Sequence, residues 1–414
     1  IFVRYPHQLS GGQKQRVMIA IAMCCQPTLL ICDEPTTALD VTVQKTILEL
    51  IKELQQEQNM GVIFITHDLG VVAEVADRTG IMYKGEILEQ NQTKAIFQTP
   101  QHPYTKALIA CRPALHPKGE KLPVVSDFMQ QDNEDMDVKP APAVTDTHHL
   151  HNDELMVQVK NLTVQYPVKT NLFGKVLHYF TAVDNVSFVI YKGETLGLVG
   201  ESGCGKTTLG RTLLRLVEPS SGNISINGKS ITAFNKNELK QFRKDVQLVF
   251  QDPFSSLNPR LTIGTAIAEP MYLFGLVKSQ AEQKNKVSEL LQKVSLPVQS
   301  AHRYPHEFSG GQRQRIVIAR ALALNPGFLV CDESVSALDV SVQAQVLNLL
   351  NDLKKELGLT LLFISHDLSV VRYMSDRIMV MKAGRIIETG SSEEIYKRPV
   401  NEYTKSLLAA IPKM

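Results

Sequence analysis

The chain has 414 residues, which is too long for a single hydrophobic core and indicates two or three domains. Its 43% hydrophobic and 21% charged residues are ordinary for globular protein, and its formal net charge of +2 gives no basic field that would favour nucleic acid. The longest apolar run, from Val17 to Cys32, is interrupted by Gln26 and Pro27, so no membrane span is predicted.

Two stretches of the chain, residues 4–113 and 303–412, are the same segment written twice with a constant offset of 299 positions. A repeat of this length is a duplicated domain, because solenoid repeats are far shorter. The second stretch follows about 150 residues of its own domain, whereas the first follows three residues. We therefore expect the C-terminal part of a first domain in residues 1–114, truncated on its N-terminal side, and a complete second domain in residues 154–414.

Early in each repeat, a serine, two glycines and a glutamine open a helical pattern. These residues are Ser10, Gly11, Gly12 and Gln13 in the first repeat, and Ser309, Gly310, Gly311 and Gln312 in the second. Serine is a favoured helix N-cap, so a plain cap is one interpretation. Two glycines in a first turn disfavour the helix, however, which suggests that bare backbone is needed there to bind an anion.

An apolar strand that ends in two carboxylates comes next in each repeat. Residues 29–32 lead into Asp33 and Glu34, and residues 328–331 lead into Asp332 and Glu333. Ligands bind beyond the carboxyl ends of parallel strands, so Asp332 would hold Mg²⁺ and Glu333 would polarise an attacking water. The alternative is a pair of surface acids that cap the following turn.

Between the repeats, residues 115–153 change character. They are acidic and contain several prolines, which predicts a linker that is partly disordered. His148, His149 and His151 cluster near its end and could form a metal site. We favour the linker, because no cysteine or carboxylate frame surrounds the three histidines.

Ahead of the second repeat, alternating apolar and polar residues predict strands at 155–164 and 182–190. Strands alternate with helices through the rest of the domain, which implies a parallel sheet with helices on both faces. The remaining predicted elements are strands at 195–199, 246–250, 328–331 and 360–364, a hairpin turn at Asn227-Gly228, and helical segments at 262–301 (most clearly 281–294), 310–324, 341–357 and 368–374.

The strongest motif follows the predicted strand at 195–199. It reads Gly200, Glu201, Ser202, Gly203, Cys204, Gly205, Lys206, Thr207, Thr208, and it fits the phosphate-binding pattern G-x-x-x-x-G-K-[ST] between a strand and a helix. Several backbone N–H groups can face one phosphate there. Lys206 would reach the β- and γ-phosphates, and the Thr207 hydroxyl would bind Mg²⁺. An ordinary glycine-rich turn is the disfavoured alternative.

Taken together, these motifs resemble the nucleotide-binding domains of ABC transporters, whose signature motif is S-G-G-Q. The Tyr-Pro-His and Tyr-Thr-Lys runs of both repeats are similar to the dipeptide, oligopeptide and nickel importer branch, and the tandem arrangement to its glutathione and peptide importers. The resemblance implies an α/β fold of the P-loop NTPase type with a RecA-like parallel-sheet core, an antiparallel β subdomain and an α-helical subdomain. One copy would be partial and one complete.

The resemblance also implies roles for single residues. Tyr166 matches the aromatic residue that stacks on adenine, with Tyr179 a weaker choice. Gln251 matches the glutamine that touches Mg²⁺, which makes Thr207, Gln251 and Asp332 the expected metal ligands.

The expected catalytic residues are Glu333 and His366 in the second domain, and Glu34 and His67 in the first. Both histidines match the switch histidine that contacts the γ-phosphate, although His366 alone would more often be a satisfied strand-end histidine. Asp40 and Asp339 match the loop that links the two sites. Some relatives carry an iron–sulfur cysteine cluster after the Tyr-Thr-Lys run. Since only Cys111 follows it here, no cluster is expected.

The implied function is ATP hydrolysis with Mg²⁺, coupled to import of dipeptides, oligopeptides or glutathione. The chain would sit peripherally on the cytoplasmic face of the inner membrane, with two permease subunits and, through them, a solute-binding protein. Nucleotide-binding domains would pair head to tail. One alternative is a soluble tandem ABC ATPase acting on ribosomes or DNA. The short acidic linker and the small net charge argue against a nucleic-acid partner. A binding module without turnover is the other alternative.

Overall fold

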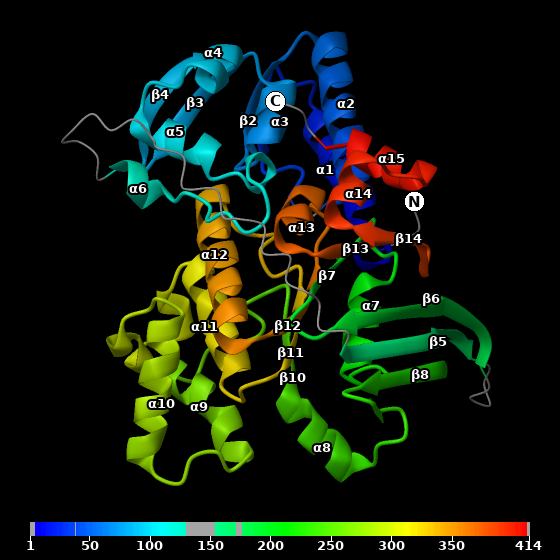
Figure 1. The fold of residues 1–414 in the computed structure, drawn as a ribbon. Coiled ribbons are helices and arrows are strands. Elements are labelled where there is room, and N and C mark those ends of the chain that lie inside the picture. The colour runs from blue at the N-terminus through cyan, green and yellow to red at the C-terminus, as the bar shows by residue number, and fades with distance from the viewer. Residues whose placement is uncertain (1–4, 38, 130–153, 171–175, 412–414) are drawn as a thin grey trace.

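The computed structural model of the chain describes residues 5–37, 39–129, 154–170 and 176–411 (Figure 1). The predicted histidine cluster at His148, His149 and His151 lies outside these residues. Within the described ranges, no helix is both long and apolar enough to cross a bilayer.

The first repeat folds into short helices around two pairs of strands. Its elements are η1 (Pro6–Gln8), α1 (Gly11–Met23), β1 (Leu29–Asp33), α2 (Val41–Gln58), β2 (Gly61–Ile65), α3 (Leu69–Val75), β3 (Arg78–Tyr83), β4 (Glu86–Gln92), α4 (Thr93–Gln98) and α5 (Pro103–Ala110). The turn η2 (Pro113–Leu115) and helix α6 (Val125–Met129) follow.

The second domain begins with β5 (Leu155–Thr170), β6 (Val176–Tyr191), β7 (Thr195–Val199), α7 (Lys206–Leu213), β8 (Ser221–Ile226), β9 (Lys229–Ser230), α8 (Lys236–Asp245), β10 (Val246–Val249), α9 (Ile263–Leu273), α10 (Gln280–Lys293) and η3 (Val298–His302). It continues with η4 (Pro305–Glu307), α11 (Gly310–Leu322), β11 (Phe328–Asp332), α12 (Val340–Leu357), β12 (Thr360–Ile364), α13 (Leu368–Met374), β13 (Arg377–Lys382), β14 (Arg385–Ser391), α14 (Ser392–Lys397) and α15 (Glu402–Ala409). From η4 onward, each element lies 299 positions after its counterpart in the first repeat, at the same length.

Local signals explain why the paired elements match. Asp40 and Asp339 cap α2 and α12, each by accepting a hydrogen bond from the backbone N–H three residues on. Both helices end at a residue in the left-handed conformation, Asn59 with φ 47° and Gly358 with φ 63°.

A six-stranded sheet in the order β10-β11-β12-β7-β13-β14 forms the centre of the second domain. All its pairings are parallel except the last, where β14 runs antiparallel to β13. Every residue of β7, β11 and β12 is buried, because helices or the second sheet cover both faces. The predicted strands at 195–199 and 360–364 are confirmed to the residue.

The second sheet is antiparallel, with the order β6-β5-β8-β9. Figure 1 shows it beside α7, whereas α9, α10 and α11 gather on the other side of the central sheet. Strands β5 and β6 are longer than the predicted 155–164 and 182–190 and pair as a long ribbon. The predicted hairpin turn is confirmed, with Asn227 and Gly228 both at positive φ between β8 and β9.

The first repeat differs from its counterpart in one respect. In the second domain β7 lies between β12 and β13, whereas β1-β2 and β3-β4 are two separate sheets with no described strand between them. The described part of the first repeat also has no counterpart of α7, whose Gly210 packs against Val330 in the second domain. Ile31 is therefore 61% exposed, while its counterpart Val330 is fully buried. Ile63 and Ile65 are similarly exposed. The first repeat thus forms only half of the architecture that the second domain completes.

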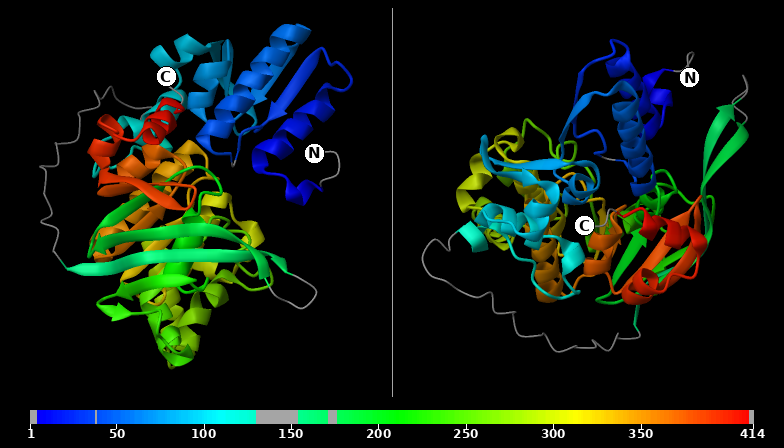
Figure 2. Two further views of the ribbon diagram at one scale, coloured as in Figure 1. Left: turned by 90° about the vertical axis from the view of Figure 1, so that its right-hand side faces the viewer. Right: turned by 90° about the horizontal axis from the view of Figure 1, so that it is seen from above.

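The two views of Figure 2 place the first repeat, in blue and cyan, against one end of the second domain. The residues that leave it do not all behave as the predicted linker. Leu122 is buried in the hydrophobic core of the second domain, and residues 125–129 form α6. The Leu122 side chain packs into the core of the second domain, a contact that the composition of the linker does not predict.

Candidate functional site

The loop after β7 depends on its glycines. Gly200, Gly203 and Gly205 all have positive φ, at 153°, 77° and 109°. A Cβ on Gly200 would lie 2.2 Å from the Met381 carbonyl oxygen, and one on Gly205 would lie 2.2 Å from the Ala182 carbonyl oxygen. Only glycine fits both the conformation and the close approach, so these positions hold the loop in one shape at the start of α7.

Lys206 lies inside this loop and is 4% exposed. Its Nζ donates hydrogen bonds to the carbonyl oxygens of Gly200, at 2.7 Å, and Glu201, at 2.9 Å. The ammonium group is therefore held beside the free N–H groups at the N-terminus of α7. A loop of this kind can bind a phosphate through backbone N–H groups and one positive charge.

Thr207 and Asp332 bring two oxygen atoms together next to the loop. The Thr207 Oγ1 donates to Asp332 Oδ1 at 3.1 Å, and Asp332 is 2% exposed at the end of β11. Burial raises the pKa of the Asp332 carboxyl, and the Thr207 hydrogen bond opposes that shift. A hydroxyl and a carboxylate oxygen fit Mg²⁺, which prefers oxygen ligands.

Glu333 follows in the left-handed conformation, with φ 46°, as does Glu34 in the first repeat. This conformation costs a residue with a Cβ about 1–2 kcal/mol. The Oε2 of Glu333 accepts a hydrogen bond from Gln251 Nε2 at 2.7 Å and lies 3.5 Å from His366 Nδ1.

Burial favours the neutral form of Glu333, but the hydrogen bond from His366 and the charges of His366 and Lys206 outweigh burial. The pKa of Glu333 therefore lies below its ordinary value. The same contact acts on His366, whose pKa lies above its ordinary value because Glu333 outweighs the effect of burial. An ionised carboxylate held beside a histidine can accept a proton from water.

Lys206, Thr207, Glu333 and His366 meet in one pocket, which encloses about 740 Å³ including the part open to solvent. Asp332 does not line this pocket and contacts it through Thr207. The residues that line it are Asp40, Tyr166, Phe180, Ala182, Ser202, Gly203, Gly205, Lys206, Thr207, Thr208, Gln251, Glu333 and His366. The structure thus brings Tyr166, the phosphate loop, Gln251, Glu333 and His366 together. It does not bring the signature residues of either repeat into this wall.

The first repeat reaches the loop through its Asp40. One carboxylate oxygen of Asp40 caps α2, and the other accepts a hydrogen bond from Ser202 N at 3.3 Å. The Thr42 hydroxyl donates to Glu201 Oε1 at 3.1 Å. Two residues at the start of α2 therefore contact the phosphate loop of the second domain.

Both signature serines act as helix caps. Ser10 and Ser309 each exchange hydrogen bonds with the glutamine three residues on, which is the plain cap that the sequence allowed. The second glycine of each pair is required by packing. A Cβ on Gly12 would lie 2.4 Å from Val43 Cγ1, and one on Gly311 would lie 2.0 Å from Val342 Cγ1.

Glu34 and His67 repeat the second domain's pair, with Oε1 of Glu34 2.9 Å from Nδ1 of His67. The hydrogen bond from His67 lowers the pKa of Glu34, and the Thr37 hydroxyl contributes a second bond. Glu34 and His67 do not line the pocket of the phosphate loop.

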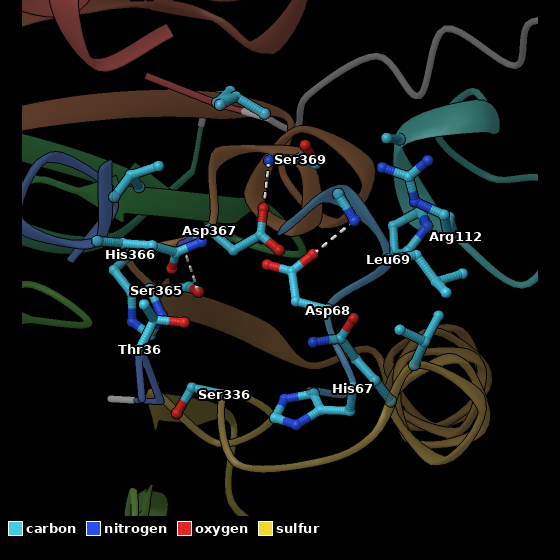
Figure 3. Close-up of a pocket in the computed structure, with 18 of the residues that line it drawn as sticks. Thr36, His67, Asp68, Leu69, Arg112, Ser336, Ser365, His366, Asp367 and Ser369 are labelled. Carbon is cyan, nitrogen blue, oxygen red and sulfur yellow. Dashed lines mark hydrogen bonds between the residues drawn. The ribbon is translucent and has the colours of Figure 1, made fainter. Parts of the chain in front are cut away.

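A second pocket, of about 1160 Å³ including its open part, lies between the loop that carries His67 and the loop that carries His366. Figure 3 shows His67 and Asp68 from the first repeat facing His366 and Asp367 from the second domain. Each aspartate caps its own helix, α3 or α13, through hydrogen bonds from backbone N–H groups. Arg112 lies at one side of this pocket.

Sequence reasoning missed two residues of the site. Phe180 lines the pocket and pairs with Tyr166 across β5 and β6, whereas Tyr179 alternates to the opposite face of its strand. The Tyr403 hydroxyl accepts a hydrogen bond from Glu201 N at 3.1 Å and so supports the loop from α15. The repeated Tyr-Thr-Lys run was the signal for Tyr403.

Among the described residues, no group of three or more His, Cys, Asp and Glu side chains is arranged to hold a metal ion. Cys111 is buried, and burial raises the pKa of its thiol to about 12.

Comparison with protein families gives two matches. A family described as "ABC transporter" matches residues 2–37 and 183–336. A second, described as "Oligopeptide/dipeptide transporter, C-terminal region", matches residues 88–135 and 387–414. The second family thus matches once in each repeat.

Among curated proteins, the glutathione import ATP-binding protein GsiA of Pectobacterium atrosepticum is 50% identical over 416 residues, covering 99% of this chain and 65% of the relative. GsiA of Salmonella typhimurium is 50% identical over 418 residues, covering 100% of this chain and 66% of the relative. The chain therefore spans slightly less than two thirds of the length of these relatives.

Among solved structures, the ATP-binding cassette MJ0796, in a dimeric post-hydrolysis state bound to ADP and Pi, is 30% identical with a TM-score of 0.52. The match covers 57% of this chain and 99% of that chain. The protein cbiO1 from Clostridium perfringens, part of the transporter complex cbiONQ, is 26% identical with a TM-score of 0.51, covering 59% of this chain and 92% of that chain.

Proposed function

Because the chain belongs to the ABC transporter family of ATP-binding proteins, we propose that it hydrolyses ATP to drive the import of peptides, including glutathione. The observation that carries the proposal is the single pocket in which Lys206, Thr207, Glu333 and His366 meet. The oligopeptide/dipeptide transporter match and the 50% identity to glutathione importers support the substrate class.

ATP would bind with its adenine on the aromatic side of the pocket and its phosphates on the loop. Tyr166 and Phe180 line the same pocket as the loop residues and present aromatic rings from neighbouring strands. The β- and γ-phosphates would accept hydrogen bonds from the loop N–H groups and from Lys206, which would exchange its bonds to the loop carbonyls for phosphate oxygens.

A Mg²⁺ ion bound with ATP would neutralise negative charge on the β- and γ-phosphates. Thr207 and Asp332 would hold it, because their oxygen atoms already lie together beside the loop. Gln251 lines the same pocket as Thr207, and its amide donates a hydrogen bond to Glu333.

Hydrolysis would need a water held in line with the γ-phosphorus. Glu333 would accept a hydrogen bond from this water and take its proton as the new P–O bond forms and the bond to the ADP oxygen breaks. His366, which lies beside Glu333, would contact the γ-phosphate. Lys206 would stabilise the negative charge that develops on this phosphate during hydrolysis.

The first repeat would complete the site as the opposite member of a head-to-tail pair. Asp40 and Thr42 already contact the phosphate loop. When the two domains close on ATP, the N-terminus of α1, residues Ser10 to Gln13, would face the γ-phosphate. Glu34, His67 and the signature at Ser309 to Gln312 would belong to a second site, which needs a phosphate loop that no described residue of the first repeat supplies.

As partners we propose two membrane permease subunits and, through them, a solute-binding protein, with the chain peripheral on the cytoplasmic face of the membrane. The curated relatives' name, glutathione import ATP-binding protein, supports this placement. A soluble tandem ATPase acting on ribosomes or DNA is the other candidate, but the net charge of +2 gives it no support.

Uptake by cells tests the proposal. Cells that lack the whole protein should lose uptake of labelled glutathione or of labelled dipeptides and longer peptides, and the wild-type gene should restore it. A gene carrying Glu333→Gln should not, although the protein is made at the same level. Unchanged uptake of glutathione, dipeptides and longer peptides in the deletion strain would contradict the proposal, even if nickel uptake were lost.

Replacing Phe180 by alanine should weaken ATP binding. Removing an aromatic ring that stacks on a base costs about 1–3 kcal/mol, which corresponds to roughly a 5- to 150-fold higher Kd. Titration of the full chain with a fluorescent ATP analogue measures the effect. The matched control is Tyr179→Ala on the opposite face of the same strand, which should leave the Kd unchanged. Equal effects of the two substitutions would remove Phe180 from the adenine site.

A further inference from the structure

The segment that leaves the first repeat crosses directly onto the second domain. After η2, residues 116–122, which we name the strap, run along α13 and α12. The strap ends at Leu122, which is 1% exposed and belongs to the same hydrophobic core as Ala344, Leu347 and Tyr373 of the second domain.

Two side chains of the second domain bind the backbone of the strap. The Asn348 amide, which is 6% exposed, accepts a hydrogen bond from Leu122 N at 2.9 Å and donates one to Leu122 O at 2.8 Å. The Tyr373 hydroxyl donates to Glu120 O at 2.6 Å. A buried asparagine whose two ends are satisfied by one residue holds that residue in a fixed register.

Charges fix the start of the strap. Lys118 forms an ion pair with Asp376, whose second oxygen lies 3.2 Å from Lys354 Nζ and accepts a hydrogen bond from Thr195 N at 2.7 Å. Although burial opposes it, the two lysines lower the pKa of Asp376 to about 2. Asp376 therefore links the strap to α12 and to the first residue of β7, the strand that leads into the phosphate loop.

Asn348 and Tyr373, which we name the strap receptor, have no equivalent at the matching positions of the first repeat. The positions 299 residues before Asn348 and Tyr373 are Glu49 and Glu74, and both are exposed. Neither glutamate can donate the hydrogen bonds that Asn348 and Tyr373 give to backbone carbonyls while it is ionised. The first repeat could not bind a strap of its own in this way, so the receptor distinguishes the two copies.

We propose that the strap is an interaction surface that keeps the two nucleotide-binding domains paired whether or not nucleotide is present. All its contacts lie away from the pocket of the phosphate loop. Opening after hydrolysis is then a hinge movement about residues 116–122, in which α1 and α2 move from the loop while the strap stays bound. The proposal does not depend on which substrate is transported.

A cleavable version of the full-length protein tests this. A protease site is placed at residue 140 and cut in the folded, nucleotide-free protein, and the two pieces are run on size exclusion. We expect them to elute together. In a version that also carries Asn348→Ala and Tyr373→Phe, the pieces should separate, with a Kd about tenfold or more higher. The matched control, Glu49→Ala with Glu74→Ala, changes the counterpart positions and should leave the pieces together.

Amide hydrogen exchange of the uncut full-length protein gives a second measurement that does not depend on handling the pieces. The Leu122 amide should exchange equally slowly with and without ATP, and at least about tenfold faster in the Asn348→Ala variant. Three results would each overturn the proposal. The Leu122 amide could be protected from exchange only when ATP is bound, the wild-type pieces could separate without nucleotide, or the variant pieces could stay bound as tightly as the wild-type pieces. Uptake assays do not bear on these outcomes.

Discussion

Replacing Glu333 by glutamine should lower the rate of ATP hydrolysis at the Lys206 site by about 100- to 1000-fold while leaving ATP bound. The amide keeps the shape of the side chain and can still contact Gln251 and His366, which lie 2.7 and 3.5 Å from the carboxylate. It cannot take a proton from the attacking water. Lys206 and the Thr207–Asp332 pair remain, so the affinity for ATP should change little.

Phosphate release in a single turnover, measured on the full-length protein with its membrane partners, gives the rate, and nucleotide titration gives the affinity. The control is Glu356→Gln, a surface acid near the end of α12 that pairs with Lys293 far from the pocket. It should behave as wild type. Normal turnover in Glu333→Gln would remove Glu333 from its role. A loss of ATP binding would assign it a structural role instead.

Replacing Ser10 by arginine should reduce hydrolysis at the same site, although Ser10 belongs to the other repeat. The long side chain would fill the space that the γ-phosphate needs when the N-terminus of α1 closes on the loop. It would also remove the cap that Ser10 gives to the N–H of Gln13. We expect a decrease of about 100-fold or more in turnover, comparable to the loss of an essential contact to the transferring phosphate.

The repeat supplies the matched comparison for this variant. Ser309→Arg makes the same change at the counterpart helix cap, with the same loss of capping at Gln312. It should leave the Lys206 site active and affect only the second site. Photo-crosslinking of labelled nucleotide, followed by separation of the two domains, assigns the effect to a site. If Ser309→Arg impaired the Lys206 site and Ser10→Arg did not, the proposed head-to-tail pairing would be wrong.

The centre of the fold could be predicted because its strands are buried on both faces. The runs at 195–199 and 360–364 are continuous and apolar between polar residues, so both their type and their ends are marked in the sequence. The β13–β14 hairpin was harder to find. β14 lies at the sheet edge, where polar residues such as Glu388 and Thr389 are tolerated and the apolar pattern fades.

The residues of the candidate site could be predicted where a short sequence motif identifies them. The phosphate loop, Asp332 and Glu333 each follow a strand and carry their own motif. Phe180 reaches the pocket only through the pairing of β5 with β6, which no local pattern encodes. Tyr403 supports the loop through the docking of α15, and the repeated Tyr-Thr-Lys run marks the residue without showing which group it contacts. The strap was missed for the same reason. The partner of Asn348 is a backbone group 226 residues away, and backbone groups have no sequence signature.

The contacts of the strap also make the order of the two copies matter. Asn348 and Tyr373 bind the strap in the second copy, whereas the matching positions of the first copy hold Glu49 and Glu74. The two copies are therefore not interchangeable. Exchanging the two copies would place the receptor before the segment that it binds, so the order of the domains is now part of what the sequence specifies.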